Sequence, residues 1–120
     1  MNSKEIIEHY IAAWNKATEA DMQQSLSACF SPVGSYTDPF TAPIVGIDAL
    51  VTVMLGLQKH FPGIVHELSG DIEVHHSSGY YPWIARLGNG KQIPGVDFID
   101  FASDGMISRV VSFTNEDAWR

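Results

Sequence analysis

The sequence has few basic residues, one cysteine and no long apolar run, and each shortage excludes a class of protein. Its 120 residues include 7 lysines and arginines against 14 aspartates and glutamates, which gives a formal charge of −7. Because nucleic acids and anionic membranes attract basic surfaces, we expect neither as a partner. No apolar stretch approaches the roughly 20 residues that a membrane-spanning helix needs.

Cysteine and metal-ligand patterns are equally scarce. Cys29 is the only cysteine, so no internal disulfide can form, and the chain fits a reducing compartment. Because Met1 is not followed by the apolar segment of a secretory signal, we expect a cytoplasmic protein. The histidines show no zinc-ligand spacing, and His75 and His76 are expected to face opposite ways on one strand. We therefore predict no metal and, since no phosphate-binding or dinucleotide motif is present, no cofactor.

No repeat, linker or low-complexity tract divides the chain, so residues 1–120 are predicted to form a single domain. The first part is predicted to be helical. Ser3 is an expected N-cap, and apolar residues follow it at helical spacing: Ile6, Ile7, Tyr10, Ile11 and Trp14.

Two further helices are predicted from capping and breaking residues. One begins at Thr18 and runs to about Cys29, where the segment 31–34, Ser-Pro-Val-Gly, is expected to stop it. The other begins at Gly46 and runs to about His60, before Phe-Pro-Gly.

The rest of the chain is predicted to form strands. Residues 64–76 are expected to be one long strand, or two with a bulge at Gly70. Further strands are expected at 35–38, 80–87, 93–101 and 106–114, with hairpin turns at Asn89-Gly90 and Asp104-Gly105. Helices followed by an antiparallel meander predict an α+β fold with the helices on one face of the sheet.

The strand at 93–101 is apolar on both faces. Ile93, Asp97 and Ile99 alternate there with Val96 and Phe98. Because three helices can cover only one face, a second copy of the chain is expected to cover the other as a homodimer.

Two aspartates stand in apolar surroundings. Asp38 lies in Tyr36-Thr37-Asp38-Pro39-Phe40, and Asp97 lies in Val-Asp-Phe. A buried carboxylate is costly unless it is paired, hydrogen-bonded or neutral, so each is a candidate acid or base. Alternatively, Asp38 is a turn former bonded to nearby backbone, and Asp97 is satisfied by a buried tyrosine or water.

This order of features resembles the nuclear transport factor 2-like superfamily, and within it the group of ketosteroid isomerase and the SnoaL-like polyketide cyclases. The resemblance rests on three N-terminal helices, the Tyr-x-Asp-Pro-Phe segment, a glycine-led third helix and the strand meander, and covers essentially the whole chain. It implies a cone-like fold, with three N-terminal helices packed on a curved, mainly antiparallel β-sheet around a pocket for a small apolar ligand.

The resemblance also implies catalytic roles. Asp38 matches the base of the isomerases, while Tyr10 and a protonated Asp97 match the pair that stabilises the enolate oxygen. Phe30 and Met54 match positions where the isomerases place supporting tyrosines, and neither can donate a hydrogen bond.

The predicted function is cofactor-independent proton transfer, of isomerase or cyclase type, on a small apolar carbonyl compound. An epoxide-hydrolase-like relative would carry an arginine where Gly95 stands. The alternatives are a non-catalytic hydrophobic binding protein and a dimerising interaction module, in which the aromatic residues belong to the core or an interface. The predicted ligand-binding residues are Tyr36, Trp83, Tyr81, Met54 and Phe30.

Overall fold

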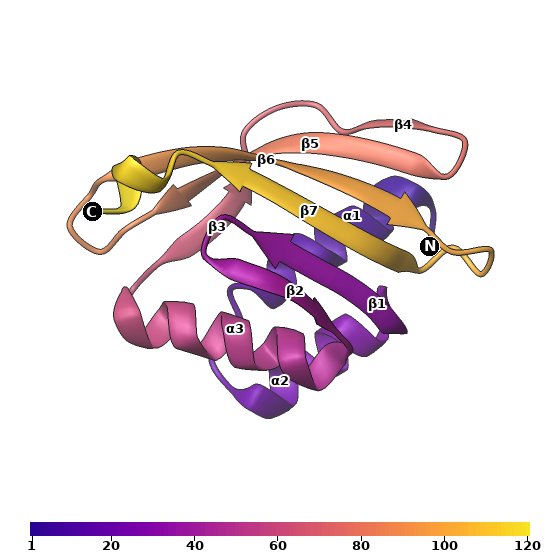
Figure 1. Cartoon of the computed structure of the whole chain (residues 1–120), viewed down its shortest axis with the longest axis horizontal. Coiled ribbons are helices and arrows are strands. Elements are labelled where there is room, and N and C mark those ends of the chain that lie inside the picture. Colours follow the sequence, from indigo (N-terminus) through magenta and orange to yellow (C-terminus); the bar gives the residue numbers. More distant parts are fainter.

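Figure 1 shows a computed structural model of residues 1–120, in which helices lie against one curved sheet. The fold is α+β, as predicted, and no helix is long and apolar enough to cross a membrane. The helices are α1 Ser3–Ala13, α2 Glu19–Ser27, α3 Ile47–His60 and the short 3₁₀ helix η1 Glu116–Trp119. The strands are β1 Phe30–Asp38, β2 Thr41–Val45, β3 Val65–Leu68, β4 Glu73–His75, β5 Ser78–Arg86, β6 Gln92–Phe101 and β7 Ile107–Thr114.

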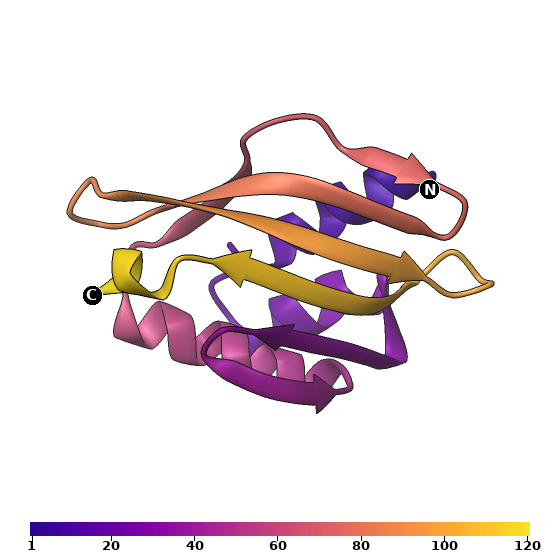
Figure 2. The same cartoon turned by 45° about the horizontal axis from the view of Figure 1, so that its top comes forward.

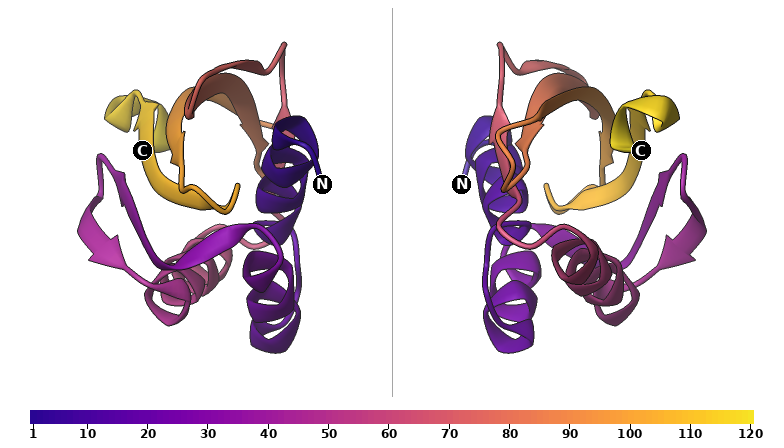
Figure 3. Two further views of the ribbon diagram at one scale, coloured as in Figure 1. Left: turned by 90° about the vertical axis from the view of Figure 1, so that its right-hand side faces the viewer. Right: turned by 90° about the vertical axis from the view of Figure 1, so that its left-hand side faces the viewer.

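The seven strands form one sheet in the order β2-β1-β7-β6-β5-β3, and β4 also pairs with β5. Neighbouring strands are antiparallel except β1 and β7, which are parallel. Figure 2 shows the long strands β5, β6 and β7 running side by side, and the end-on views in Figure 3 show how strongly they curve. α1 lies across the concave side of the sheet, and α3 packs along β1 and β2.

The first helix is capped one residue earlier than expected. Asn2, not Ser3, is the N-cap: its side chain accepts a hydrogen bond from the N–H of Glu5, and the Glu5 side chain accepts one from the N–H of Asn2. This reciprocal capping box satisfies two backbone donors that the helix itself leaves free. The apolar stripe is confirmed, since its five predicted members are all buried: Ile6, Ile7, Tyr10, Ile11 and Trp14.

The second helix ends before residue 31, as predicted, but residues 31–34 belong to β1 and not to a break between elements. Pro32 lies where the register between β1 and β7 shifts, between the pairs Phe30–Ile107 and Ser35–Arg109. A proline has no N–H to give to a ladder, and it is tolerated in a strand at such an irregularity. The edge strand β2 was not predicted at all.

The segment at 64–76 forms two strands, as one of the two alternatives predicted. β3 and β4 both pair with β5, and the chain leaves the sheet between them at residues 69–72. Pro82 of β5 has no N–H for that edge, and only its carbonyl is used, accepting from the N–H of Ser69 at 3.1 Å. The interruption therefore follows from a proline on the neighbouring strand.

The expected orientation of His75 and His76 is also wrong. β4 ends at His75, and His76 turns away from the strand with a φ of 52°. Both imidazoles consequently lie on the same side, with their Nδ1 atoms 3.2 Å apart. No third histidine, cysteine, aspartate or glutamate joins them in a metal-binding cluster.

The central strands separate a buried face from an exposed one. On β6, Ile93, Asp97 and Ile99 face the core, whereas Phe98 is 49% exposed. Phe98 contacts Tyr80 of β5 and Phe113 of β7, with ring centroids 5.8 and 5.7 Å apart. We call Tyr80, Phe98 and Phe113 the outer patch.

Candidate functional site

A cavity of about 450 Å³ lies between the helices and the concave side of the sheet. Asp38, the last residue of β1, and Asp97, in the middle of β6, both line it. The two carboxyl groups, far apart in the sequence, thus open into the same space.

Asp97 is the deeper of the two, at 4% exposure. The Tyr81 hydroxyl donates to its Oδ2 at 2.7 Å, and the Trp83 indole N–H donates to its Oδ1 at 2.8 Å. Burial raises the pKa of Asp97, against the lowering effect of hydrogen bonds from Ser112, Tyr81 and Trp83. The carboxyl group is therefore hydrogen-bonded by a buried tyrosine, as one of the alternatives predicted. It also forms part of the cavity wall.

The position of Trp83 depends on a glycine on the next strand. Gly95 pairs with Trp83 across β5 and β6, and a Cβ atom at Gly95 would overlap the indole ring. Without that atom the indole can lie across β6 and reach Asp97. Any side chain at position 95, arginine included, is incompatible with this arrangement.

Asp38 is half-buried and held by two neighbours. The Tyr36 hydroxyl donates to Oδ2 at 2.6 Å, and the backbone N–H of Phe40 donates to Oδ1 at 2.8 Å. Both bonds stabilise negative charge on the carboxylate. Burial raises the pKa of the Tyr36 hydroxyl, so that side chain remains a neutral donor. Asp38 is thus a turn residue, as one alternative held, and a cavity residue at once.

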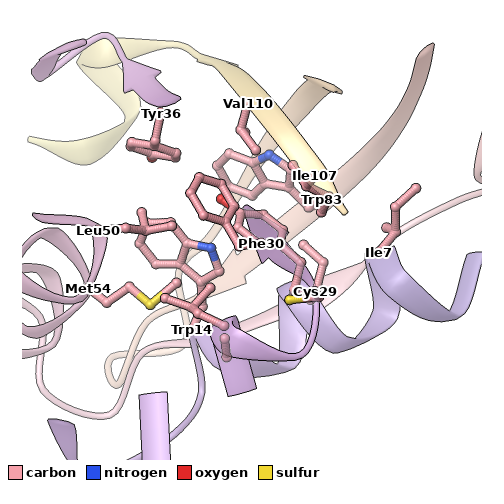
Figure 4. Close-up of a cluster of buried hydrophobic side chains, with 14 of the residues drawn as sticks. Ile7, Trp14, Cys29, Phe30, Tyr36, Leu50, Met54, Trp83, Ile107 and Val110 are labelled. Atoms are coloured by element: carbon pink, nitrogen blue, oxygen red, sulfur yellow. The ribbon is translucent and has the colours of Figure 1, made fainter. Parts of the chain in front are cut away.

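Tyr10 does not line the cavity. Its ring is fully buried against Phe30 and Trp14, at centroid distances of 6.3 and 6.4 Å, and its hydroxyl has no hydrogen-bond partner. Burial, followed by the charge of Asp97, raises the pKa of that hydroxyl. Phe30, Met54 and Tyr81 are likewise fully buried and not part of the cavity wall, so of the five predicted ligand-binding residues only Tyr36 and Trp83 line it. Figure 4 shows Phe30 and Met54 within this core, beside Trp14 and Tyr36.

Rings from several elements surround the cavity in one continuous series, which we call the aromatic belt. Successive centroids are 5.6, 5.2, 5.8, 6.5 and 6.3 Å apart. Asp38 closes the series, because it is hydrogen-bonded to the first and last members. The members, all on the cavity wall, are in this order Tyr36, Trp14, His66, Trp83, Trp119 and Phe40.

His66 is a member of the belt that sequence analysis missed. Its ring lies between the indoles of Trp14 and Trp83, and burial lowers its pKa to about 4, so the imidazole is neutral. Its backbone is held by Asn15, whose side chain donates to the carbonyl at 2.7 Å and accepts from the N–H at 2.8 Å. No spacing along the chain signals this residue, because its partners come from other elements.

Comparison with known families agrees with this architecture. A family model of the SnoaL-like domain matches residues 7–110. None of the curated proteins matches the sequence.

Solved structures share the fold at low sequence identity. A provisionally named isomerase of the SnoaL-like family from Agrobacterium tumefaciens str. C58 has a TM-score of 0.85 and 22% identity, covering 92% of this chain and 95% of that one. A provisionally named SnoaL-like polyketide cyclase from Jannaschia sp. CCS1 has a TM-score of 0.74 and 14% identity, covering 97% and 89%. A protein of ketosteroid isomerase-like fold from Catenulispora acidiphila DSM 44928, in complex with trimethylamine, has a TM-score of 0.78 and 12% identity, covering 95% and 88%.

Proposed function

Because the chain belongs to the SnoaL-like domain family, we propose that it is a cofactor-independent proton-transfer enzyme of isomerase or cyclase type. Its substrate is a small, largely apolar carbonyl compound. The observation that carries the proposal is that Asp38 and Asp97 line one cavity in different environments. Carboxyl groups in such unlike surroundings divide the roles of base and acid between them.

In this mechanism Asp38 removes a proton from the carbon next to the substrate carbonyl. The Tyr36 hydroxyl and the Phe40 N–H hold the carboxylate in place. Asp97, whose pKa is raised by burial, acts in its protonated form in this mechanism and donates a hydrogen bond to the oxygen on which negative charge develops. In an isomerase the proton returns from Asp38 to a different carbon. In a cyclase the enolate carbon attacks a second carbonyl, and the alkoxide formed there takes up the proton from Asp38. Tyr10 does not contact the substrate in this mechanism, because it does not line the cavity.

The Asp38→Asn variant tests the role of the base. Proton removal can be followed without knowing the natural substrate, as deuterium uptake next to the carbonyl of cyclic ketones and enones in D₂O by NMR. The wild type should accelerate the uptake for at least one compound, and Asp38→Asn should lose about 10²- to 10⁴-fold of that acceleration.

A matched variant controls for loss of negative charge. Asp71 is exposed and outside the cavity, so Asp71→Asn should exchange at the wild-type rate. An unchanged rate in Asp38→Asn would remove the base from the proposal, whereas equal losses in both variants would assign the effect to charge or folding.

A second candidate function is binding without catalysis. It is favoured by the two hydrogen bonds that Asp38 accepts from its own chain, since they engage both oxygens of the carboxylate. In that case a ligand would be recovered unchanged and undeuterated after long incubation with the protein.

We also propose that a second copy of the chain covers the outer patch. Its three rings are 45%, 49% and 55% exposed and form one apolar surface on the face opposite the cavity. Phe98→Glu should then convert a dimer to a monomer in analytical ultracentrifugation, and Val33→Glu, at an exposed site on β1, should not. A wild-type monomer at high concentration would exclude this assembly and leave the patch to an unrelated partner, as the interaction-module alternative requires.

A further inference from the structure

We propose that His66 binds the ligand directly, donating a hydrogen bond from Nε2 to an uncharged acceptor oxygen other than the one that faces Asp97. The inference rests on the proposed role of the cavity as a ligand site. It adds a requirement on the ligand: two acceptor oxygens, one for each of these residues.

The His66 ring is held in a defined position without any bond to its own nitrogens. It is 8% exposed, and the indoles of Trp14 and Trp83 lie 5.2 and 5.8 Å from it, centroid to centroid. The two hydrogen bonds with Asn15 fix its backbone. Contact with two indoles and a fixed backbone restrict the rotation of this ring.

The tautomer of His66 follows from which of its ring nitrogens is completely buried. Nδ1 is completely buried and has no hydrogen-bond partner. A buried N–H without a partner is rarer in proteins than an acceptor without one, and a neutral imidazole carries only one N–H. The proton therefore belongs on Nε2. Nε2 also has no hydrogen-bond partner in the protein, but it is not completely buried. Because His66 is part of the cavity wall, this nitrogen is available to a ligand there.

The charge around the cavity determines which acceptor suits this donor. A neutral imidazole brings no positive charge, and Asp38 and Asp97 share the same space. Arg120 also lines the cavity, but its guanidinium is paired with Asp117 at 3.0 Å. A ligand carboxylate or phosphate would be desolvated there beside Asp38, so the matching group is a carbonyl, ether or hydroxyl oxygen.

Trp83 relates the two donor positions to each other. Its indole N–H bonds to Asp97, while its ring packs against His66. Trp83 thus contacts both of the residues to which the ligand would be hydrogen-bonded. A ligand with a single oxygen could use only one of them.

Two fluorescent phenols of similar size can test the second contact. 7-Hydroxycoumarin carries a phenol and a distant lactone carbonyl, whereas 2-naphthol carries only the phenol. Their dissociation constants should be measured by calorimetry, below the pKa of both phenols, for the wild type and for His66→Phe. Phenylalanine keeps a ring between Trp14 and Trp83 but has no N–H.

We expect His66→Phe to weaken 7-hydroxycoumarin by about 3- to 10-fold, the range for one lost hydrogen bond, and to leave 2-naphthol within about twofold. His66→Gln, which keeps an N–H donor, should restore part of the difference. Circular dichroism and the unfolding midpoint check that each variant is folded.

Three results would overturn the proposal. If neither dissociation constant changes in His66→Phe, the ring nitrogen does not contact the carbonyl. If both probes weaken equally, His66 only packs the wall. If neither probe binds the wild type, the cavity does not take such acceptors. The first two results leave the Asp38 exchange experiment untouched, so the His66 proposal can fail while the proposed function stands.

Discussion

The concave and convex faces of β5, β6 and β7 both carry aromatic rings. The rings differ in burial and in whether they are hydrogen-bonded to a carboxyl group. On the concave face, Tyr81 and Trp83 are buried and donate hydrogen bonds to Asp97. On the convex face the rings of the outer patch are about half exposed and contact one another. The same kinds of residue thus surround a perturbed carboxyl group on one side and form a simple apolar surface on the other.

The carboxyl groups of β6 show the same contrast. Asp97 and Asp100 are three positions apart and point to opposite faces. Asp100 accepts from the Ser78 hydroxyl at 3.0 Å and pairs with Arg109 at 3.5 Å, with 43% of its side chain exposed. The partners of Asp100 are exposed to water, whereas those of Asp97 are buried, so burial rather than residue type makes Asp97 the chemical candidate.

The largest difference in stability between the two faces should come from removing the side-chain carboxyl groups of Asp97 and Asp100, one at a time. Asp97→Ala leaves the Tyr81 hydroxyl and the Trp83 N–H unpaired in the core, at about 1–3 kcal/mol each, so we expect about 4 kcal/mol lower stability. Asp100→Ala should cost less than about 1 kcal/mol, as exposed ion pairs do. Urea unfolding at neutral pH measures both, and similar losses would contradict the contrast.

Acid should lower the free energy of unfolding of the protein through His66, on the concave side of the sheet. Its pKa is about 4 in the folded chain and 6.5 in the unfolded chain, so between these values only the unfolded chain takes up the proton. Stability is therefore lost as pH falls through this window, by roughly 3 kcal/mol at about 1.4 kcal/mol per pH unit.

The contribution of His66 can be separated from that of Asp97. Asp97, with its raised pKa, acts in the opposite direction, because the folded chain takes up its proton first as pH falls. It is present in both wild type and His66→Phe, so the difference between their unfolding free energies isolates His66. Parallel curves for wild type and His66→Phe would contradict the prediction.

Filling the space under Trp83 should have a smaller effect. Gly95→Ala places a methyl group within the indole ring, and such overpacking typically costs about 1–3 kcal/mol. The displaced indole should also change the near-ultraviolet circular dichroism. Gly56→Ala, on the exposed side of α3 with no atom nearby, should instead stabilise the protein by about 0.5–1 kcal/mol. If Gly95→Ala left the stability unchanged, the position of the Trp83 indole would not depend on this glycine.

Much of the fold could be predicted, because its signals are local. The apolar stripe of α1, the Thr18 cap, the glycine at the start of α3 and the turn at Asp104-Gly105 each depend on residues a few positions apart. The misplaced segments have the opposite character. Pro32 is accommodated by a register shift against β7, and the break between β3 and β4 reflects Pro82 on β5.

The candidate site shows the same division between local and distant causes. Asp38 and Asp97 could be singled out because each stands among apolar neighbours in the sequence. Tyr10, Phe30 and Met54 were expected near the ligand through resemblance to a family, and lie instead in the core, since a helical or strand face does not reveal how deep it is buried.

The sequence alone determined most of the helices and strands, though not β2, and placed Asp97 and Asp100 on opposite faces, because 3.6-residue and two-residue periodicities are properties of the local backbone. Only the tertiary structure decided that Asp38 and Asp97 share a cavity, that Gly95 makes room for Trp83, and that a neutral His66 lies between two indoles. Those arrangements depend on the curvature of the sheet and on ring contacts between distant segments, and no spacing along the chain encodes them.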